Sequence, residues 1–195
     1  MSAEGIVAEE GLLQARELLK LECFGIDDLL EAFEEASPQG TLSVDNYQRC
    51  MGYLLQLGGL EEGSPRRSHA EGLCMDIFDG FDTRGAGVVD AAAITSGVSI
   101  LSGASVDEKI SMGFALHDRD GDGLVSFDET VQYMSCVFRV LSCTSAAPVR
   151  SLQAPEKLAL WTSEQCYREA GLDRGGRLNI AQFKRFVKQG TGLGM

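Results

Sequence analysis

The chain has 195 residues, and its 29 Asp and Glu against 17 Lys and Arg give a formal net charge of −12 at pH 7. A charge this negative argues against nucleic acid and anionic lipid as partners, because both are bound through clustered Lys and Arg, and it suits a cation or a basic partner segment. Hydrophobic residues make up 44% of the sequence, so the chain is not disordered by default and can bury one sizeable core or two small lobes.

The N-terminal segment MSAEGIVAEE has no basic region and no glycine at position 2, so we expect neither a signal peptide nor an N-myristoyl anchor. No apolar run reaches the roughly 18 residues that a transmembrane helix needs, so no transmembrane segment is expected. The cysteines are scattered without a CxxC pair, which predicts reduced core residues of an intracellular protein and no zinc site. These cysteines are Cys23, Cys50, Cys74, Cys136, Cys143 and Cys166.

Helical patterns follow one another along most of the chain. Six segments have apolar residues at helical spacing. In chain order they are residues 9–22, 24–36, 73–81, 110–116, 127–141 and 159–170. Residues 61–70 and 144–157 are rich in Ser, Pro, Gly or Ala, and we interpret them as a loop and a flexible linker. The remaining gaps between helices are short loops, and everything between these loops is expected to be helical.

One of these gaps, residues 118–129, reads DRDGDGLVSFDE. Calcium takes six to eight oxygen ligands, and a twelve-residue calcium loop supplies them from positions 1, 3, 5, 7, 9 and 12 with Gly at position 6. Gly123 stands at position 6 here, where the chain turns sharply. The predicted ligands are Asp118, Asp120, Asp122, Leu124 through its carbonyl, Ser126 through a water, and Glu129 with two oxygens. The loop therefore predicts one Ca²⁺ site.

Three further segments repeat the skeleton of this loop: residues 35–46, 82–93 and 171–182. Each has Gly at position 6 and an apolar residue at position 8, which suits a short strand. These pairs are Gly40 with Leu42, Gly87 with Val89, and Gly176 with Leu178. The chain therefore contains four loops of one kind.

The three repeats lack the ligands of the intact loop. In residues 82–93, Arg84 stands at position 3 and Ala93 at position 12, so the two-oxygen ligand is missing. Residues 35–46 end in Asn46 instead of a carboxylate, and residues 171–182 contain Arg174 and Arg177, which repel a cation. We expect all three loops to be without calcium.

The predicted fold is all-α, with four helix–loop–helix units in two paired lobes. Paired loops join through short two-strand ladders, so we expect Leu42 beside Val89 and Val125 beside Leu178. The predicted domains are an N-terminal helix, an N-terminal lobe with both loops degenerate, a C-terminal lobe with the intact loop and the linker 144–157, and a flexible tail. Their ranges are residues 1–22, 23–102, 103–190 and 191–195.

Residues 77–129 carry FDxxxxGxV, a GxSxLxxGxxxEK link and F-x-x-x-D-x-D-x-D-G, and residues 37–42 read SPQGTL. These motifs resemble the neuronal calcium sensors and calaxin, the ciliary dynein calcium sensor, all members of the EF-hand superfamily; a calcineurin-B-like regulatory protein is also compatible. The resemblance covers roughly residues 24–142. It departs from those families at Arg84 and Ala93, because their second loop usually binds calcium, and in lacking the myristoyl glycine of neuronal calcium sensors.

The resemblance implies Ca²⁺ as cofactor and a protein target, namely an amphipathic helix or a motor or axonemal subunit. We therefore expect a calcium sensor or regulatory subunit and not an enzyme, in the cytoplasm, with the axoneme of a cilium or flagellum as the narrower location. A groove lined by methionines would suit such a target. The candidates are Met51, Met75, Met112 and Met134, with ordinary core packing as the alternative.

Three other function classes compete with the sensor. A constitutive structural subunit of a larger complex, stabilised by one Ca²⁺, is the alternative because three of four loops are degenerate. A calcium buffer is disfavoured, since a buffer gains from more sites. An enzyme is disfavoured because only His69 and His117 are present and no nucleophile–base pattern accompanies them.

Overall fold

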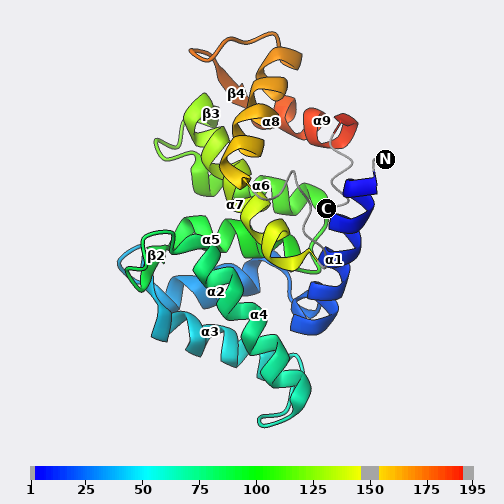
Figure 1. The fold of residues 1–195 in the computed structure, drawn as a ribbon. Helices are drawn as coiled ribbons and strands as arrows, with labels where there is room; N and C mark the ends of the chain where they lie inside the picture. The colour runs from blue at the N-terminus through cyan, green and yellow to red at the C-terminus, as the bar shows by residue number, and fades with distance from the viewer. Residues whose placement is uncertain (1–2, 146–153, 191–195) are drawn as a thin grey trace.

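The structure, a computed structural model, describes residues 3–145 and 154–190 (Figure 1). Its helices are α1 (Ala3–Leu19), α2 (Ile26–Ala36), α3 (Val44–Leu57), α4 (Pro65–Phe81), α5 (Ala91–Val98), α6 (Val106–His117), α7 (Phe127–Thr144), α8 (Pro155–Glu169) and α9 (Ile180–Gly190). Two 3₁₀ turns, Leu21–Cys23 and Ser99–Leu101, follow α1 and α5. Apart from two short ladders, the regular secondary structure of the described residues is helical, so the all-α prediction is confirmed. None of the helices described is both long and apolar enough to cross a lipid bilayer.

The strands form two antiparallel ladders between pairs of loops. β1 (Thr41–Ser43) pairs with β2 (Val88–Asp90), and β3 (Leu124–Ser126) pairs with β4 (Arg177–Asn179). Leu42 lies opposite Val89 and Val125 lies opposite Leu178, as the sequence predicts. All four of these side chains are buried. The first two loops are therefore one pair and the last two another.

Each exit helix begins directly after the last residue of the preceding strand. Ser43, Asp90 and Ser126 accept a hydrogen bond from the backbone nitrogen three residues further on and so cap α3, α5 and α7. These are the residue types that cap helix N-termini best, because a short side-chain oxygen reaches an otherwise unpaired N–H. Loop, strand and exit helix are thereby fixed relative to one another.

Helix α7 lies in the middle of the molecule and joins its two halves (Figure 1). It packs against α8 in its own half and against α4, α5 and α1 in the other. Helices α7 and α5 approach closely at Gly97, where a Cβ would lie only 2.9 Å from the carbonyl oxygen of Cys136. The buried side chains form one continuous hydrophobic cluster. A boundary between residues 102 and 103 stays a prediction.

Two expectations about segments between helices need correction. Residues 65–70 are the first turns of α4 and not a loop, because Ser64 caps the helix and Pro65 occupies a position where its missing N–H costs nothing. The Arg67 guanidinium is buried and donates to the carbonyl oxygen of Gly52 at 2.9 Å, which anchors this turn. The helix predicted over residues 9–22 begins at Ala3 and ends at Leu19, earlier than predicted at both ends.

The predicted linker and tail are only partly covered by the structure. The linker at 144–157 begins as α7 ends at Thr144 and is over by Pro155, where α8 starts. Its central residues 146–153 and the predicted tail 191–195 lie outside the described residues.

The cysteines are all free thiols. The predicted core placement holds for four of them, Cys50, Cys74, Cys136 and Cys166. Burial raises the pKa of Cys74 to about 12, so this thiol stays protonated at neutral pH. Cys143 is half-buried, and Cys23 is exposed at the end of the 3₁₀ turn after α1.

Candidate metal centre

The loop between α6 and β3 gathers three carboxylates. Oxygens of Asp118, Asp120 and Asp122 all lie within 4.8 Å of one another. The turn is possible because Gly121 and Gly123 have positive φ angles of 68° and 78°, which residues with a Cβ rarely adopt. Across residues 3–145 and 154–190, this is the one cluster of acidic, His or Cys side chains with the geometry to hold a metal ion.

Backbone hydrogen bonds orient the cluster. The nitrogen of Gly123 donates to Asp118 Oδ2 at 2.9 Å, and the nitrogen of Leu124 donates to Asp122 Oδ1 at 2.9 Å. The other oxygen of Asp118, Oδ1, is buried and accepts no hydrogen bond from any residue the structure describes. A buried carboxylate oxygen without a partner is unfavourable, and a hard cation would satisfy it. The donor set therefore fits Ca²⁺.

The remaining predicted ligands lie beside the cluster and not in it. Glu129 Oε2 accepts hydrogen bonds from the backbone nitrogen of Ser126 at 2.8 Å and from its Oγ at 2.7 Å. The backbone hydrogen bond from Ser126 is the main reason that the pKa of Glu129 is lowered. Leu124 has only its carbonyl to offer. Asp118, Asp120 and Asp122 are thus brought together, while the ligand roles of Leu124, Ser126 and Glu129 stay predictions.

A side chain from the neighbouring loop also occupies the site, which the ligand pattern of the sequence does not predict. Arg177 Nη1 donates to Asp122 Oδ2, and Nη2 donates to Asp120 Oδ2 at 2.8 Å. Nη2 also lies 4.0 Å from Glu129 Oε2. The hydrogen bond from Arg177 is the main cause of the lowered pKa of Asp120. The predicted pairing of the two loops could have indicated this contact, because Arg177 at position 7 of the fourth loop lies opposite Ser126 at position 9 of the third.

The first two loops are closed by their own hydrogen bonds. Asp82 accepts from the backbone nitrogens of Ala86 at 2.9 Å and Gly87 at 2.7 Å, so its carboxylate is engaged inside the loop. Asn46 stands at position 12 of the first loop and donates through Nδ2 to the carbonyl of Ala36 at 2.8 Å. These contacts stabilise the shape of both loops, and the absence of calcium from them stays a prediction.

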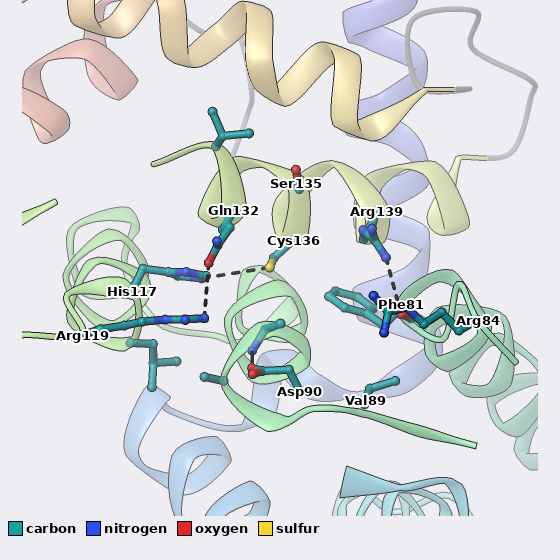
Figure 2. Close-up of a pocket in the computed structure, with 14 residues that line it drawn as sticks. Phe81, Arg84, Val89, Asp90, His117, Arg119, Gln132, Ser135, Cys136 and Arg139 are labelled. Carbon is teal, nitrogen blue, oxygen red and sulfur yellow. Dashed lines mark hydrogen bonds between the residues drawn. The ribbon is translucent and has the colours of Figure 1, made fainter. Parts of the chain in front are cut away.

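A cavity of about 790 Å³ lies beside the acidic loop, between β2 and α5 on one side and α6 and α7 on the other (Figure 2). Gln132, Ser135, Cys136 and Arg139 reach it from α7 (Figure 2). The lining also includes Phe81, Arg84, Val89, Asp90, Ala92, Ala93, Leu116, His117, Arg119 and Val131. Three arginines surround the cavity although the chain as a whole is acidic.

His117 stands at the end of α6 beside this cavity. Its ring stacks on Tyr133 with 5.5 Å between centroids, and burial lowers its pKa to about 4. The imidazole is therefore neutral at pH 7 and acts as a packing group.

Three of the four candidate methionines are core residues, since Met51, Met112 and Met134 are buried. Met51 also lines, together with Met75, a smaller cavity of about 310 Å³ between α3 and α4. Core packing therefore accounts for three of them, and the residues that the structure describes form no continuous methionine groove.

Comparison with known proteins agrees with this geometry, although no protein-family model matches the chain. The chain is 25% identical to a guanylyl cyclase inhibitory protein of Lithobates pipiens over 124 residues, 64% of this chain and 55% of that protein. It is 23% identical to visinin of Gallus gallus over 111 residues, 57% of this chain and 53% of visinin. It is 30% identical to calcineurin B of Candida glabrata over 113 residues, 57% of this chain and 58% of that protein.

The fold has four helix–loop–helix units with paired loops, and the third loop is acidic. These features and the relatives indicate the same family. The chain resembles the calcium-binding proteins of the EF-hand superfamily. The aligned part spans about half of the frog and chicken EF-hand proteins. Within this chain, loop 118–129 is the candidate site.

Proposed function

We propose that this EF-hand protein binds one Ca²⁺ in residues 118–129 and acts as a calcium-responsive regulatory subunit of a partner protein. The observation that carries the proposal is the unpaired, buried Asp118 Oδ1 within a group of three carboxylates. The relatives support Ca²⁺ as the ion, because one match, at 26% identity, is a probable calcium-binding protein of Arabidopsis thaliana. They also support a regulatory role over catalysis.

The protein groups that would hold the ion are the three aspartates, the Leu124 carbonyl, Ser126 and Glu129. Bound Ca²⁺ supplies positive charge that neutralises these carboxylates. Glu129 belongs to the first turn of α7, and in the described state its carboxylate caps that helix through Ser126. Recruiting Glu129 to the ion therefore acts directly on α7.

Helix α7 connects the loop to the cavity. Its first turn carries Glu129, and its later turns carry Cys136 and Arg139 on the cavity wall. A small rotation of α7 changes the shape of the cavity and its packing against α4 and α5. We propose this cavity as the place where an amphipathic helix of the partner docks, with acidic residues on its polar edge to meet the arginines.

The narrower proposal is a motor or axonemal partner, such as a ciliary dynein-type assembly, with the protein in the cytoplasm or axoneme. It rests on the motifs in residues 77–129 that resemble calaxin. The second candidate is a constitutive structural subunit with one stabilising Ca²⁺. The internal hydrogen bonds of the first two loops favour it, because these loops hold their shape without an ion.

Calcium titration in the presence of a fluorescent probe for apolar surface separates the two candidates. The sensor predicts calcium binding together with increased probe fluorescence, and the Glu129→Gln variant should show neither. Calcium binding without a change in the probe would support the structural role. No calcium binding would contradict both.

A further inference from the structure

The guanidinium of Arg177 lies where a cation bound to the third loop would have to interact. It contacts Asp120 and Asp122 through different nitrogens and lies 4.0 Å from the Glu129 carboxylate. Three of the predicted ligands thus face one arginine that comes from a different loop. An arginine fork matches carboxylates through its fixed N–H groups and is always charged.

The ladder explains why Arg177 reaches this place. In an antiparallel pair, residues directly opposite each other project from the same face. Arg177 is opposite Ser126, whose side chain lies at position 9 of the acidic loop. The side chain of Arg177 therefore projects toward the ligands, and Leu178, which follows it, is buried between the loops.

Arg174, the other arginine of the fourth loop, has a different environment. It pairs with Glu164 on α8, and its guanidinium lies over the ring of Phe127 at 5.0 Å from the centroid. Its charge is thereby engaged away from the three aspartates. Arg174 is therefore a matched control for Arg177, because it carries the same charge in the same loop at a different position. Only two residues separate the two arginines in the sequence.

We propose that Arg177 is a tethered counter-cation that competes with Ca²⁺ for the third loop, a role that rests on the proposed calcium function. In the calcium-free protein its positive charge holds Asp120 and Asp122 together against their mutual repulsion. An arriving ion displaces the guanidinium, because both need the same oxygens. The degenerate fourth loop thus lowers the affinity of its neighbour and responds when that neighbour is filled.

This competition has two consequences. The affinity for Ca²⁺ is lower than the ligand set alone would give, because binding also breaks the contacts of Arg177. Removing the charge also removes its repulsion of the ion, so we expect Arg177→Gln to bind Ca²⁺ roughly tenfold more tightly. Arg177 opens the strand β4, which leads directly into α9, so the start of that helix should report occupancy.

The test is isothermal titration of Ca²⁺ into the full chain, comparing wild type, Arg177→Gln and Arg174→Gln. Thermal unfolding with and without Ca²⁺ gives a second readout. We expect Arg177→Gln to bind roughly tenfold more tightly and to unfold at a lower temperature when calcium-free, because its aspartates repel. We expect Arg174→Gln to keep the wild-type affinity within about twofold, since it removes the same charge further from the ligands.

Equal affinities in all three proteins would overturn the proposal, and so would weaker binding by Arg177→Gln, which would make Arg177 an organiser of the loop. Tighter binding by both variants would overturn it too, since net charge alone would then explain the effect. Binding by Arg177→Gln but not by wild type would support it in an extreme form. If no variant binds Ca²⁺, the proposed function itself fails.

Discussion

Glu129 Oε2 lies 2.8 Å from the backbone nitrogen of Ser126 and 2.7 Å from its Oγ, so one carboxylate caps α7 and is also the predicted ligand at position 12. The capping role and the ligand role are thereby placed on the same atoms. A cap needs only an acceptor, which Glu and Gln both provide, whereas a two-oxygen calcium ligand needs the carboxylate. The two roles can therefore be separated by substitution.

Glu129→Gln should keep the calcium-free stability of the wild type within about 0.5 kcal/mol, because its amide oxygen still accepts from Ser126. Glu129→Ala should lose about 1 kcal/mol, since the helix loses that contact. Both should lose calcium binding. Urea unfolding in the presence of a chelator measures the first two effects. Equal destabilisation by both substitutions would show that the negative charge, and not the hydrogen bond, stabilises the start of α7.

Calcium should alter hydrogen exchange mainly in residues 105–145 and 154–190. The intact loop lies in this half of the chain, and α7 leads away from it. Helix α5, which packs against α7, is the element of the N-terminal half most exposed to the effect. The β1–β2 ladder should exchange alike with and without calcium. Changes concentrated in residues 24–60 would contradict this division.

Lys109 predicts a pH effect on stability. Its side chain is buried, Nζ donates to the carbonyl of Ile100 at 3.0 Å, and burial lowers its pKa to about 8 from a usual value of 10.5. Between pH 10.5 and 8 the unfolded chain binds a proton that the folded chain does not, so the free energy of unfolding decreases as the pH falls through this range. Well below pH 8 this decrease is complete.

Lys109→Met removes this titration. The variant should therefore gain stability relative to wild type as the pH falls: the difference in unfolding free energy, variant minus wild type, should be larger at pH 7.5 than at pH 10 by about 3 kcal/mol at most. Measuring the difference between the two proteins cancels the thiols and tyrosines that titrate in the same range. A difference that does not depend on pH would show that folding leaves the pKa of Lys109 unchanged.

The thiols should differ sharply in reactivity. Cys23 is exposed, while Cys50, Cys74, Cys136 and Cys166 are buried. Burial raises the pKa of Cys50 to about 11, which also suppresses its thiolate. A thiol reagent should label one cysteine rapidly in the native protein, and Cys23→Ser should abolish that phase. Rapid labelling of several thiols would mean that the core opens readily.

The loops were predictable because their glycines and apolar strand residues are dictated by local geometry. Gly123 must adopt a positive φ, and Val125 must fill the ladder, so both can be recognised from spacing alone. The same logic found Leu42 opposite Val89 in loops that have lost their ligands. Backbone requirements thus persist where the chemistry of the loop does not.

Contacts between distant segments were not predictable in the same way. The start of α4 depends on the cap at Ser64 and on burial of Arg67 against the carbonyl of Gly52, which residue composition conceals. Arg177 was interpreted only as unfavourable to its own loop, because its action on Asp120 crosses the ladder. The central position of α7 likewise depends on tertiary packing.

The central claim is a single calcium site in residues 118–129, and the stoichiometry of calcium binding tests it most directly. Isothermal titration of the full chain should give one Ca²⁺ per molecule with a dissociation constant of about 10⁻⁷–10⁻⁵ M. The Hill coefficient should be near one, because the neighbouring loop is not expected to bind. Glu129→Gln should abolish the signal. Two or more sites of similar affinity, or unchanged binding in that variant, would contradict the assignment.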